Sequence, residues 1–151
     1  MQIEINEITV LETYPLRHAL LRKGRPLSSC KLEGDQYIET IHLGAFFEKK
    51  LIGIGSAFLK PCPQYPKLNG VQLRAIAVAP NFQRKGVASQ LIQNLLQKIE
   101  IQLNPKCIWL NARIPANALY LSNGFQPVGS PFEIEPIGAH QRFIKIYPHD
   151  T

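Results

Sequence analysis

The sequence predicts one mixed α/β domain, and three observations lead to that fold class. The chain has 151 residues, of which 45% are hydrophobic and 19% charged, a composition that suits one globular domain with a real core. Segments that alternate apolar and polar residues, as half-buried strands do, are interleaved with segments of helical spacing. No internal repeat, low-complexity tract or linker separates them. We therefore expect residues 1–151 to form a single domain.

The first quarter of the chain predicts a strand followed by a helix. Ile3 to Ile8 alternates apolar and polar residues, as a half-buried strand should. Val10 to Lys23 has closer to helical spacing, and Pro15 should lie in the first turn because proline deeper inside a helix removes a hydrogen bond. Gly24-Arg25-Pro26 should end this helix. Leu27 to Gln36 is ambiguous and is interpreted as a loop with a helical turn.

The middle of the chain predicts a β-hairpin. Residues 40–47 and 51–59 read as two strands, and the short charged link at 48–50 makes them antiparallel neighbours. The prolines at 61–66 predict a loop. The elements expected after it are a strand at 71–78, a helix from about 85 to 102, a strand at 107–112, a short helix at 115–122 ended by Asn123-Gly124, and last strands at 125–128 and 141–147.

Charge and cysteine usage narrow the function classes. The net charge is +6, but the basic residues are scattered, with no block longer than two. Nucleic-acid binders usually gather such residues on one face, so we expect no nucleic-acid partner. Three widely spaced cysteines without zinc-site spacing indicate reduced thiols. The sequence has no apolar run near the roughly 18 residues that span a bilayer, and its acidic N-terminus lacks a signal core. We expect a cytoplasmic protein without a membrane partner.

The turn Gln83-Arg84-Lys85-Gly86-Val87-Ala88 lies between a predicted strand and a predicted helix. Backbone N–H groups at a helix start lack intrahelical partners, and the helix dipole adds positive charge there. With two basic side chains alongside, this arrangement favours an anion such as pyrophosphate. The glycine patterns of a phosphate loop and of a dinucleotide fold are both absent. Simple helix entry remains the alternative interpretation of this turn.

A second motif, Arg113-x-x-Ala116-x-x-Leu119-Tyr120-x-x-x-Gly124-Phe125, follows about 30 residues later. Together with Gln83-x-x-Gly86-x-Ala88, it resembles the Gcn5-related N-acetyltransferase (GNAT) superfamily. The later Phe132-Glu133-Ile134-Glu135 and the histidine of Ile137-Gly138-Ala139-His140 are similar to the small bacterial ElaA-like subgroup. Arg113 departs from the pattern, because asparagine is common at that position.

The resemblance implies a mixed, mostly antiparallel sheet flanked by helices, with a splayed strand pair that holds acetyl-CoA. Backbone N–H groups of the turn would bind the pyrophosphate, and the preceding strand would pair with the pantetheine arm. No metal would be needed. The residues that the resemblance assigns to the cofactor are Ile76, Ala77, Val78, Gln83, Arg84, Lys85, Gly86, Val87, Ala88 and Ser89.

For catalysis, the resemblance points to Tyr120 as the acid that protonates the departing thiolate, with an aromatic core anchor as the alternative role. The general base is not identified by sequence. Histidine titrates near neutral pH, so His42 and His140 are candidates, with a structural role as the alternative for each. Arg74, Arg113 and His140 are the candidate substrate-binding residues, since a guanidinium can bind a substrate carboxylate. Surface ion pairs are the alternative for the two arginines.

The resulting hypothesis is an acetyl-CoA-dependent N-acetyltransferase that acts by direct transfer on a primary amine of a small molecule or peptide. A ping-pong route through Cys62 or Cys107 is a less supported variant. A non-catalytic acyl-CoA-binding sensor is the alternative function. The acceptor is not identified, because the loops expected at 24–36, 61–70 and 130–140 would line its pocket. A homodimer is left open.

Overall fold

The computed structural model describes residues 1–148, and its centre is one seven-stranded sheet in the order β1-β2-β3-β4-β5-β7-β6. All neighbouring strands are antiparallel except β4 and β5. Residues 149–151 of the expected domain lie outside the described residues. The strands are β1 (Glu4–Glu7), β2 (Ile41–Phe47), β3 (Lys50–Leu59), β4 (Gly70–Val78), β5 (Cys107–Arg113), β6 (Gln126–Ile134) and β7 (Gly138–Ile146).

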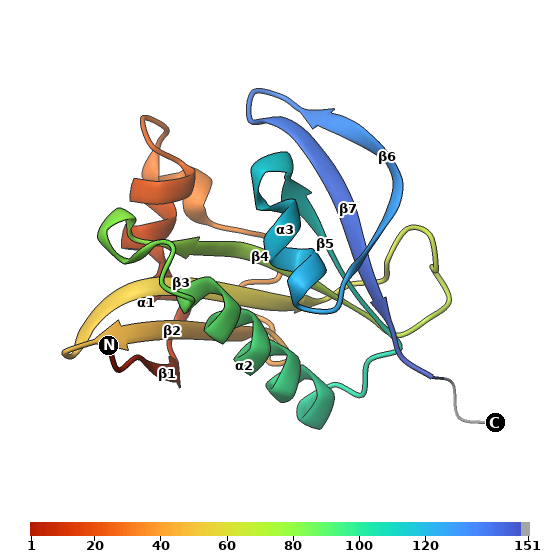
Figure 1. Ribbon diagram of the computed structural model, residues 1–151, viewed down its shortest axis with the longest axis horizontal. Helices are drawn as coiled ribbons and strands as arrows, with labels where there is room; N and C mark the ends of the chain where they lie inside the picture. Colours follow the sequence, from red (N-terminus) through yellow and green to blue (C-terminus); the bar gives the residue numbers. More distant parts are fainter. Residues whose placement is uncertain (149–151) are drawn as a thin grey trace.

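Helices cover both faces of this sheet (Figure 1). The α-helices are α1 (Val10–Leu16), α2 (Val87–Gln102) and α3 (Asn117–Ser122). Short turns of other helix types are η1 (Arg17–Leu21), η2 (Leu27–Cys30), η3 (Pro80–Phe82) and η4 (Ile114–Ala116). Within the described residues, none of the helices is both long enough and apolar enough to cross a membrane.

Two glycines of β3 let α2 pack tightly on one face. A Cβ at Gly53 or Gly55 would lie 3.1 Å from a methyl group of Leu91 or Leu95. Ser56 points to the other face, where its hydroxyl accepts a hydrogen bond from Arg17 of η1. Because side chains alternate across a strand, α2 and η1 lie on opposite faces of the sheet.

The predicted antiparallel hairpin, now β2 and β3, is confirmed.

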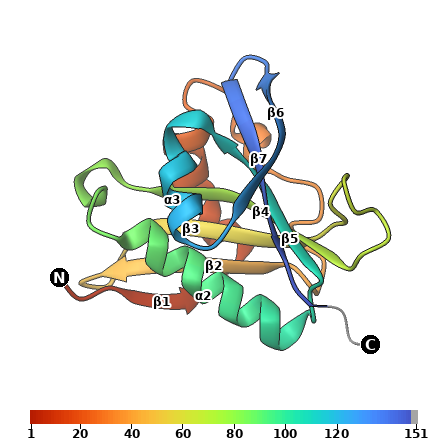
Figure 2. The ribbon, with the colours of Figure 1, turned by 45° about the vertical axis from the view of Figure 1, so that its right-hand side comes forward.

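β4 and β5 pair only at one end. Gly70–Gln72 lie opposite Cys107–Trp109 in a parallel register, and no pairing joins the two strands beyond that point. Figure 2 shows the strands diverging from this end, with α3 beside the opening. The predicted splayed strand pair is therefore confirmed, with the two strands unpaired beyond Gln72 and Trp109.

β4 also carries a bulge at Ala75. Arg74 lies opposite Ser56 and Ala77 lies opposite Ile54, so Gly55 faces both Ala75 and Ile76. Ala75 has a φ of +57°, in the left-handed region, which costs a residue with a Cβ about 1 kcal/mol or more. A bulge leaves backbone groups outside the ladder and redirects side chains. This distortion lies beside the gap between β4 and β5.

The end of the chain differs from its prediction. Strands were expected at 125–128 and 141–147 with a loop at 130–140, whereas β6 and β7 form one long hairpin through most of that loop. The expectation was wrong, and β6 forms although it contains Pro127 and Pro131, which normally argue against a strand. β6 lies at the edge of the sheet, where proline is tolerated, and a bulge between Val128 and Phe132 absorbs the irregularity.

Two helix boundaries also differ. Thr9 and Glu12 form a capping box that starts α1 at Val10, so Pro15 lies in the second turn and the prediction of a first-turn position was wrong. The helical segment then ends in the π-helical η1 at Leu21, before the predicted Lys23. α2 begins at Val87 because Gly86 before it has left-handed backbone angles. The ambiguous segment at 27–36 does contain a helical turn, η2.

Candidate active site

The turn between β4 and α2 is held open toward the splayed strands. The side-chain amide of Gln83 donates a hydrogen bond of 3.0 Å to the Val78 carbonyl, which ties the turn to the strand end. Gly86 has a φ of +81°, and a Cβ there would meet nothing within 4 Å. Its glycine is thus required for the backbone angle. No side chain caps α2, and the first helical bond runs from the Gln90 N–H to the Gly86 carbonyl. The N–H groups of residues 87–89 lack helical partners.

A cleft of about 620 Å³ opens in front of these N–H groups; we call it the α2 cleft. The end of β4, the turn and the start of α2 form one wall, and Leu20, Leu21, Leu119 and Tyr120 close the other side. All residues that the sequence assigned to the cofactor line this cleft except Lys85. The structure thus brings the predicted phosphate-binding turn and the predicted Tyr120 to one cavity.

A second cleft of about 650 Å³, the β5 cleft, lies between β4 and β5 and extends over β7. It shares lining residues with the α2 cleft, so the two spaces adjoin. The shared residues are Leu21, Ile76, Arg113, Ala116 and Tyr120. All three predicted substrate-binding residues, Arg74, Arg113 and His140, line the β5 cleft. Arg74, Ala75 and Ile76 all line this cleft, at the end of β4 that β5 leaves unpaired.

Tyr120 lies where the two clefts meet. Its side chain is 7% exposed and packs against Phe125 and Phe143 at ring-centroid distances of 6.1 and 6.0 Å. Burial raises the pKa of Tyr120 to about 12, so its phenol is neutral at physiological pH. Its hydroxyl has no hydrogen-bond partner within residues 1–148. α3 ends as predicted at Asn123-Gly124, where the Phe125 N–H bonds the Tyr120 carbonyl.

The two candidate histidines have different surroundings. His140 Nδ1 donates to the Gly138 carbonyl at 2.7 Å, and its ring stacks on Phe132. This leaves Nε2 of the neutral ring as an acceptor on a residue that lines the β5 cleft. His42 lines neither cleft. Its Nε2 donates to the Asp35 carbonyl at 2.9 Å and its Nδ1 accepts from the Ser56 hydroxyl at 2.7 Å.

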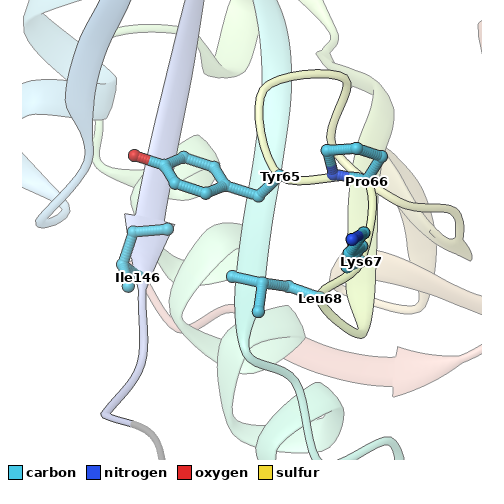
Figure 3. A pocket seen from close by; sticks show the side chains of 5 residues that line it. All are labelled: Tyr65, Pro66, Lys67, Leu68 and Ile146. Carbon is cyan, nitrogen blue, oxygen red and sulfur yellow. The ribbon is translucent and has the colours of Figure 1, made fainter.

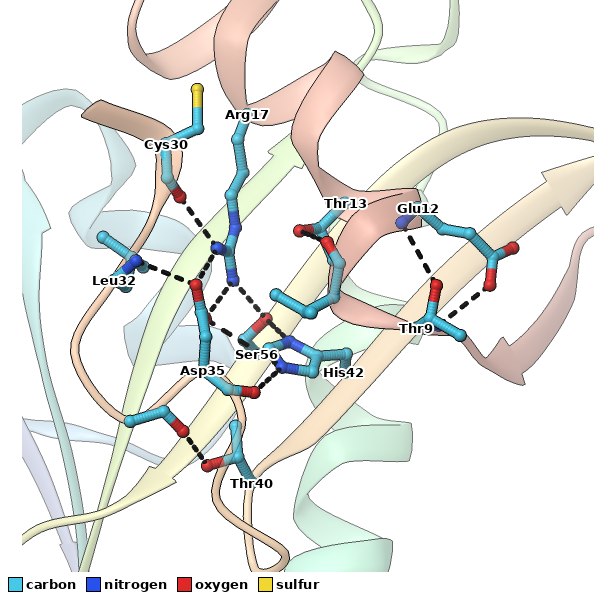
Figure 4. Close-up of polar contacts among 12 residues, drawn as sticks. Thr9, Glu12, Thr13, Arg17, Cys30, Leu32, Asp35, Thr40, His42 and Ser56 are labelled. Carbon is cyan, nitrogen blue, oxygen red and sulfur yellow. Dashed lines mark hydrogen bonds and ion pairs between the residues drawn. The ribbon is translucent and has the colours of Figure 1, made fainter. Parts of the chain in front are cut away.

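His42 belongs to a buried polar network that joins η1 to the sheet (Figure 4). Arg17, 2% exposed, forms a bidentate ion pair with Asp35 at 2.8 and 3.0 Å and also donates to Ser56. Burial lowers the pKa of His42, and the positive charge of Arg17 lowers it further against the bond to Asp35. This network holds η1 in place, with Leu21 beside both clefts and Arg22, just after η1, beside the β5 cleft.

Sequence reasoning missed Arg142 of β7. Its Nε donates to Asn111 at 2.9 Å and its Nη1 donates to Gln64 at 3.2 Å. The guanidinium lies over the rings of Trp109 and Phe132 at 5.1 and 5.6 Å from their centroids. No motif marks this arginine. It joins the site only because the β5–β7 register pairs Arg142 with Asn111.

Other features lie apart from the two clefts. Cys62 and Cys107 are fully buried and line neither cleft. Burial and the adjacent Cys62 raise the pKa of Cys107 to about 12, which makes it a poor nucleophile. A shallow apolar hollow of about 400 Å³ lies between the loop at 65–68 and Ile146 (Figure 3), and none of the predicted site residues lines it.

Comparison with known proteins agrees with this geometry. The family model described as an acetyltransferase (GNAT) domain matches residues 39–127. An uncharacterized N-acetyltransferase of Bacillus subtilis, YitI, is 30% identical over 138 residues, which cover 91% of this chain and 92% of YitI. Among solved structures, ElaA of Escherichia coli superposes with a TM-score of 0.74 at 18% identity, covering 95% of this chain and 99% of ElaA. An aminoglycoside 6′-N-acetyltransferase complexed with coenzyme A also gives 0.74, at 15% identity, covering 98% of this chain and 99% of that one.

Proposed function

This chain belongs to the GNAT acetyltransferase family, and from that premise we propose that it is an acetyl-CoA-dependent N-acetyltransferase that acts by direct transfer on a primary amine. The observation that carries this proposal is the pair of adjoining clefts that both have Tyr120 in their walls. One cleft would hold the acyl donor and the other the amine. Direct transfer needs both reactants side by side, and two adjoining clefts support that proposal.

The α2 cleft fits coenzyme A. The unpartnered N–H groups of residues 87–89 and the positive end of α2 suit a pyrophosphate. Ile76, Ala77 and Val78 would offer backbone groups to the amide-rich pantetheine arm, since β5 leaves that part of β4 unpaired. The aminoglycoside acetyltransferase with the same fold carries coenzyme A, which supports this assignment. When bound, acetyl-CoA supplies the activated acetyl thioester.

Tyr120 would donate a hydrogen bond to the sulfur of the departing thiol. A phenol with a pKa of about 12 is a weaker acid than a thiol of pKa about 8.5. Complete proton transfer in the ground state is therefore uphill by roughly three pKa units. Stabilisation of the developing thiolate by this neutral hydroxyl, which no described residue binds, is the contribution proposed for Tyr120.

His140 would accept the proton that the amine must lose. Its Nε2 is free to accept because Nδ1 holds the proton that bonds Gly138. His42 is unsuited to this role, because both of its ring nitrogens are engaged outside the clefts. Backbone N–H groups near the Ala75 bulge would stabilise negative charge on the acetyl oxygen. Together these groups account for proton removal, oxyanion stabilisation and thiol departure.

The test measures thiol release from acetyl-CoA across a panel of primary amines, with mass spectrometry of the acetylated products. A thermal-shift titration with acetyl-CoA runs beside it. We expect turnover with at least one amine and a stabilising shift with acetyl-CoA. A stabilising shift without turnover across a broad panel would instead favour the alternative, a non-catalytic acyl-CoA sensor.

A further inference from the structure

The β5 cleft carries an unbalanced positive charge. Four arginines and Lys60 line it, and none of its lining residues is an aspartate or glutamate. The arginines are Arg22, Arg74, Arg113 and Arg142. Like charges repel each other, more strongly where water is partly excluded. A cleft of this composition needs an explanation beyond the net charge of the chain.

Arg74 is half-buried without a carboxylate partner. Its guanidinium carbon lies 6.0 Å from the centroid of the Phe58 ring. Burial, and after it the charges of Arg22 and Arg17, lower the pKa of Arg74. The negative charge of Asp35 raises the pKa of Arg74. However, both carboxylate oxygens of Asp35 already bind Arg17.

The other cleft arginines also lack acidic partners. Within residues 1–148, the ion pairs involve only the cations Arg17, His42 and Lys98. Taking a cation out of water without a partner is unfavourable. The uncompensated charge of this cleft would be balanced if a ligand brought the anion.

The guanidinium of Arg142 is held in an orientation that suits binding of an anion. Its bonds to Asn111 and Gln64 use Nε and Nη1, while Trp109 and Phe132 hold the plane of the guanidinium. Nη2 has no hydrogen bond among the described residues. A fixed guanidinium loses little conformational entropy when it binds a carboxylate or phosphate, so this geometry suits an anionic group of a substrate.

The phosphates of coenzyme A do not account for this charge. The proposed pyrophosphate site lies at the start of α2, and Arg22, Arg74 and Arg142 do not line that cleft. Arg113 lines both clefts, so its role is ambiguous between them. We therefore assign the anion that would balance the other three arginines to the acceptor substrate.

We propose that the acceptor is an anionic amine: a compact primary amine that also carries a carboxylate or phosphate group, held by Arg74 and Arg142 in the β5 cleft. This inference rests on the proposed function. It deepens that function by naming the chemical class of the amine, and it excludes polyamines and other cationic amines as preferred substrates.

The experiment compares matched amines that differ in one anionic group. The pairs are β-alanine against β-alaninamide and O-phosphoethanolamine against ethanolamine, with spermidine as the cationic reference. We expect kcat/KM to be higher by about 10-fold or more for the anionic member of at least one pair, in line with a charged hydrogen bond. The pair that shows the advantage tells carboxylate from phosphate. Equal values within both pairs, or a preference for spermidine, would overturn the inference.

Variants locate the effect. Arg74→Met and Arg142→Met should each reduce the anionic advantage by about 10-fold or more, while their thermal shift with acetyl-CoA shows that they remain folded. Arg25→Gln removes an exposed charge outside both clefts and should keep the full advantage. If the advantage survives in both methionine variants, the assignment to these two arginines is wrong.

A binding readout separates this inference from the proposed function. Isothermal titration of the same amines into protein saturated with coenzyme A needs no turnover. If no amine is acetylated but only the anionic members bind, the proposed acetyltransferase activity is wrong and the proposed anion site is supported. If amines are acetylated and the neutral members bind as well as the anionic ones, the acetyltransferase activity is supported and the proposed anion site is wrong.

Discussion

At the scale of single residues, Tyr120 combines a packing role with a proposed chemical one, and the two can be separated. Tyr120→Phe keeps the ring that contacts Phe125 and Phe143 and removes only the hydroxyl. We expect kcat at saturating substrates to fall about 10²-fold, with the acetyl-CoA thermal shift unchanged. Since the pKa of Tyr120 is about 12, its ionisation should cause no loss of rate below about pH 10. Unchanged turnover in the variant would leave Tyr120 with packing alone.

His42 makes stability depend on pH. Burial lowers its pKa below the ordinary 6.5, so the unfolded chain takes up a proton at a pH where the folded chain does not. Neutral His42 therefore makes its full contribution to the free energy of unfolding above pH 6.5. This contribution is lost as the pH falls from 6.5 through the pKa of His42 in the folded protein. Arg17, Asp35, Ser56 and Phe58 surround the ring.

Urea unfolding between about pH 5 and 7 measures this effect. We expect His42→Gln to be less stable at pH 7 but to lose less stability on acidification than the unmodified protein. His18→Gln is the matched control for the loss of a histidine outside the buried network, because His18 bonds only the exposed Arg25 carbonyl. An unaltered slope in the His42 variant would mean that other groups carry the pH dependence.

At the scale of elements, the bulge of β4 is a strained feature in the wall of the β5 cleft. Ala75 with its φ of +57° is strained, and a β-branched residue there is strained further. We expect Ala75→Gly to keep stability within about 1 kcal/mol, since relief of strain offsets the entropy of glycine. Ala75→Val should lower the free energy of unfolding by more than that and reduce turnover. Both are measured by urea titration and thiol release.

The control for this pair is Ala139→Val on β7, an exposed position without left-handed angles. Valine favours strands, so this variant should be close to neutral. If Ala75→Val were equally neutral, the bulge would be far more adaptable than its register with β3 suggests.

Elements set by local pattern could be predicted from the sequence. The β2–β3 hairpin follows from alternation around a short charged link, and α2 follows from helical spacing after a glycine. The β6–β7 hairpin was underestimated, because the tolerance of an edge strand for Pro127 and Pro131 depends on a position in the sheet that spacing does not encode. The bulge at Ala75 has no sequence signal, since the usual residue there would be glycine.

The candidate site divides in the same way. Tyr120 and the turn at 83–88 come from contiguous motifs, and the structure places them at one cavity. Arg142 and Asn111 are 31 residues apart and meet only through the pairing of β5 with β7. The positive charge of the acceptor side was therefore visible in the sequence as a total, but its concentration in one cleft depends on tertiary structure.

At the scale of the whole molecule, the adjoining α2 and β5 clefts predict the kinetic pattern of a reaction in which both substrates are bound together. Donor and acceptor would occupy the α2 and β5 clefts together, with Tyr120 at the junction. Initial rates measured against both substrates should therefore give intersecting lines in double-reciprocal plots. A ping-pong route would give parallel lines, because the first product would leave before the amine binds.

The cysteines provide the chemical counterpart of that measurement. Cys62 and Cys107 are 0% exposed, and the raised pKa of Cys107 opposes thiolate formation. Intact-mass measurement after incubation with acetyl-CoA should show no stable acetyl adduct, and Cys107→Ser should keep its rate if it folds. Parallel lines together with a cysteine-bound acetyl group would reverse the assignment, because transfer would then pass through a thiol that must first become exposed.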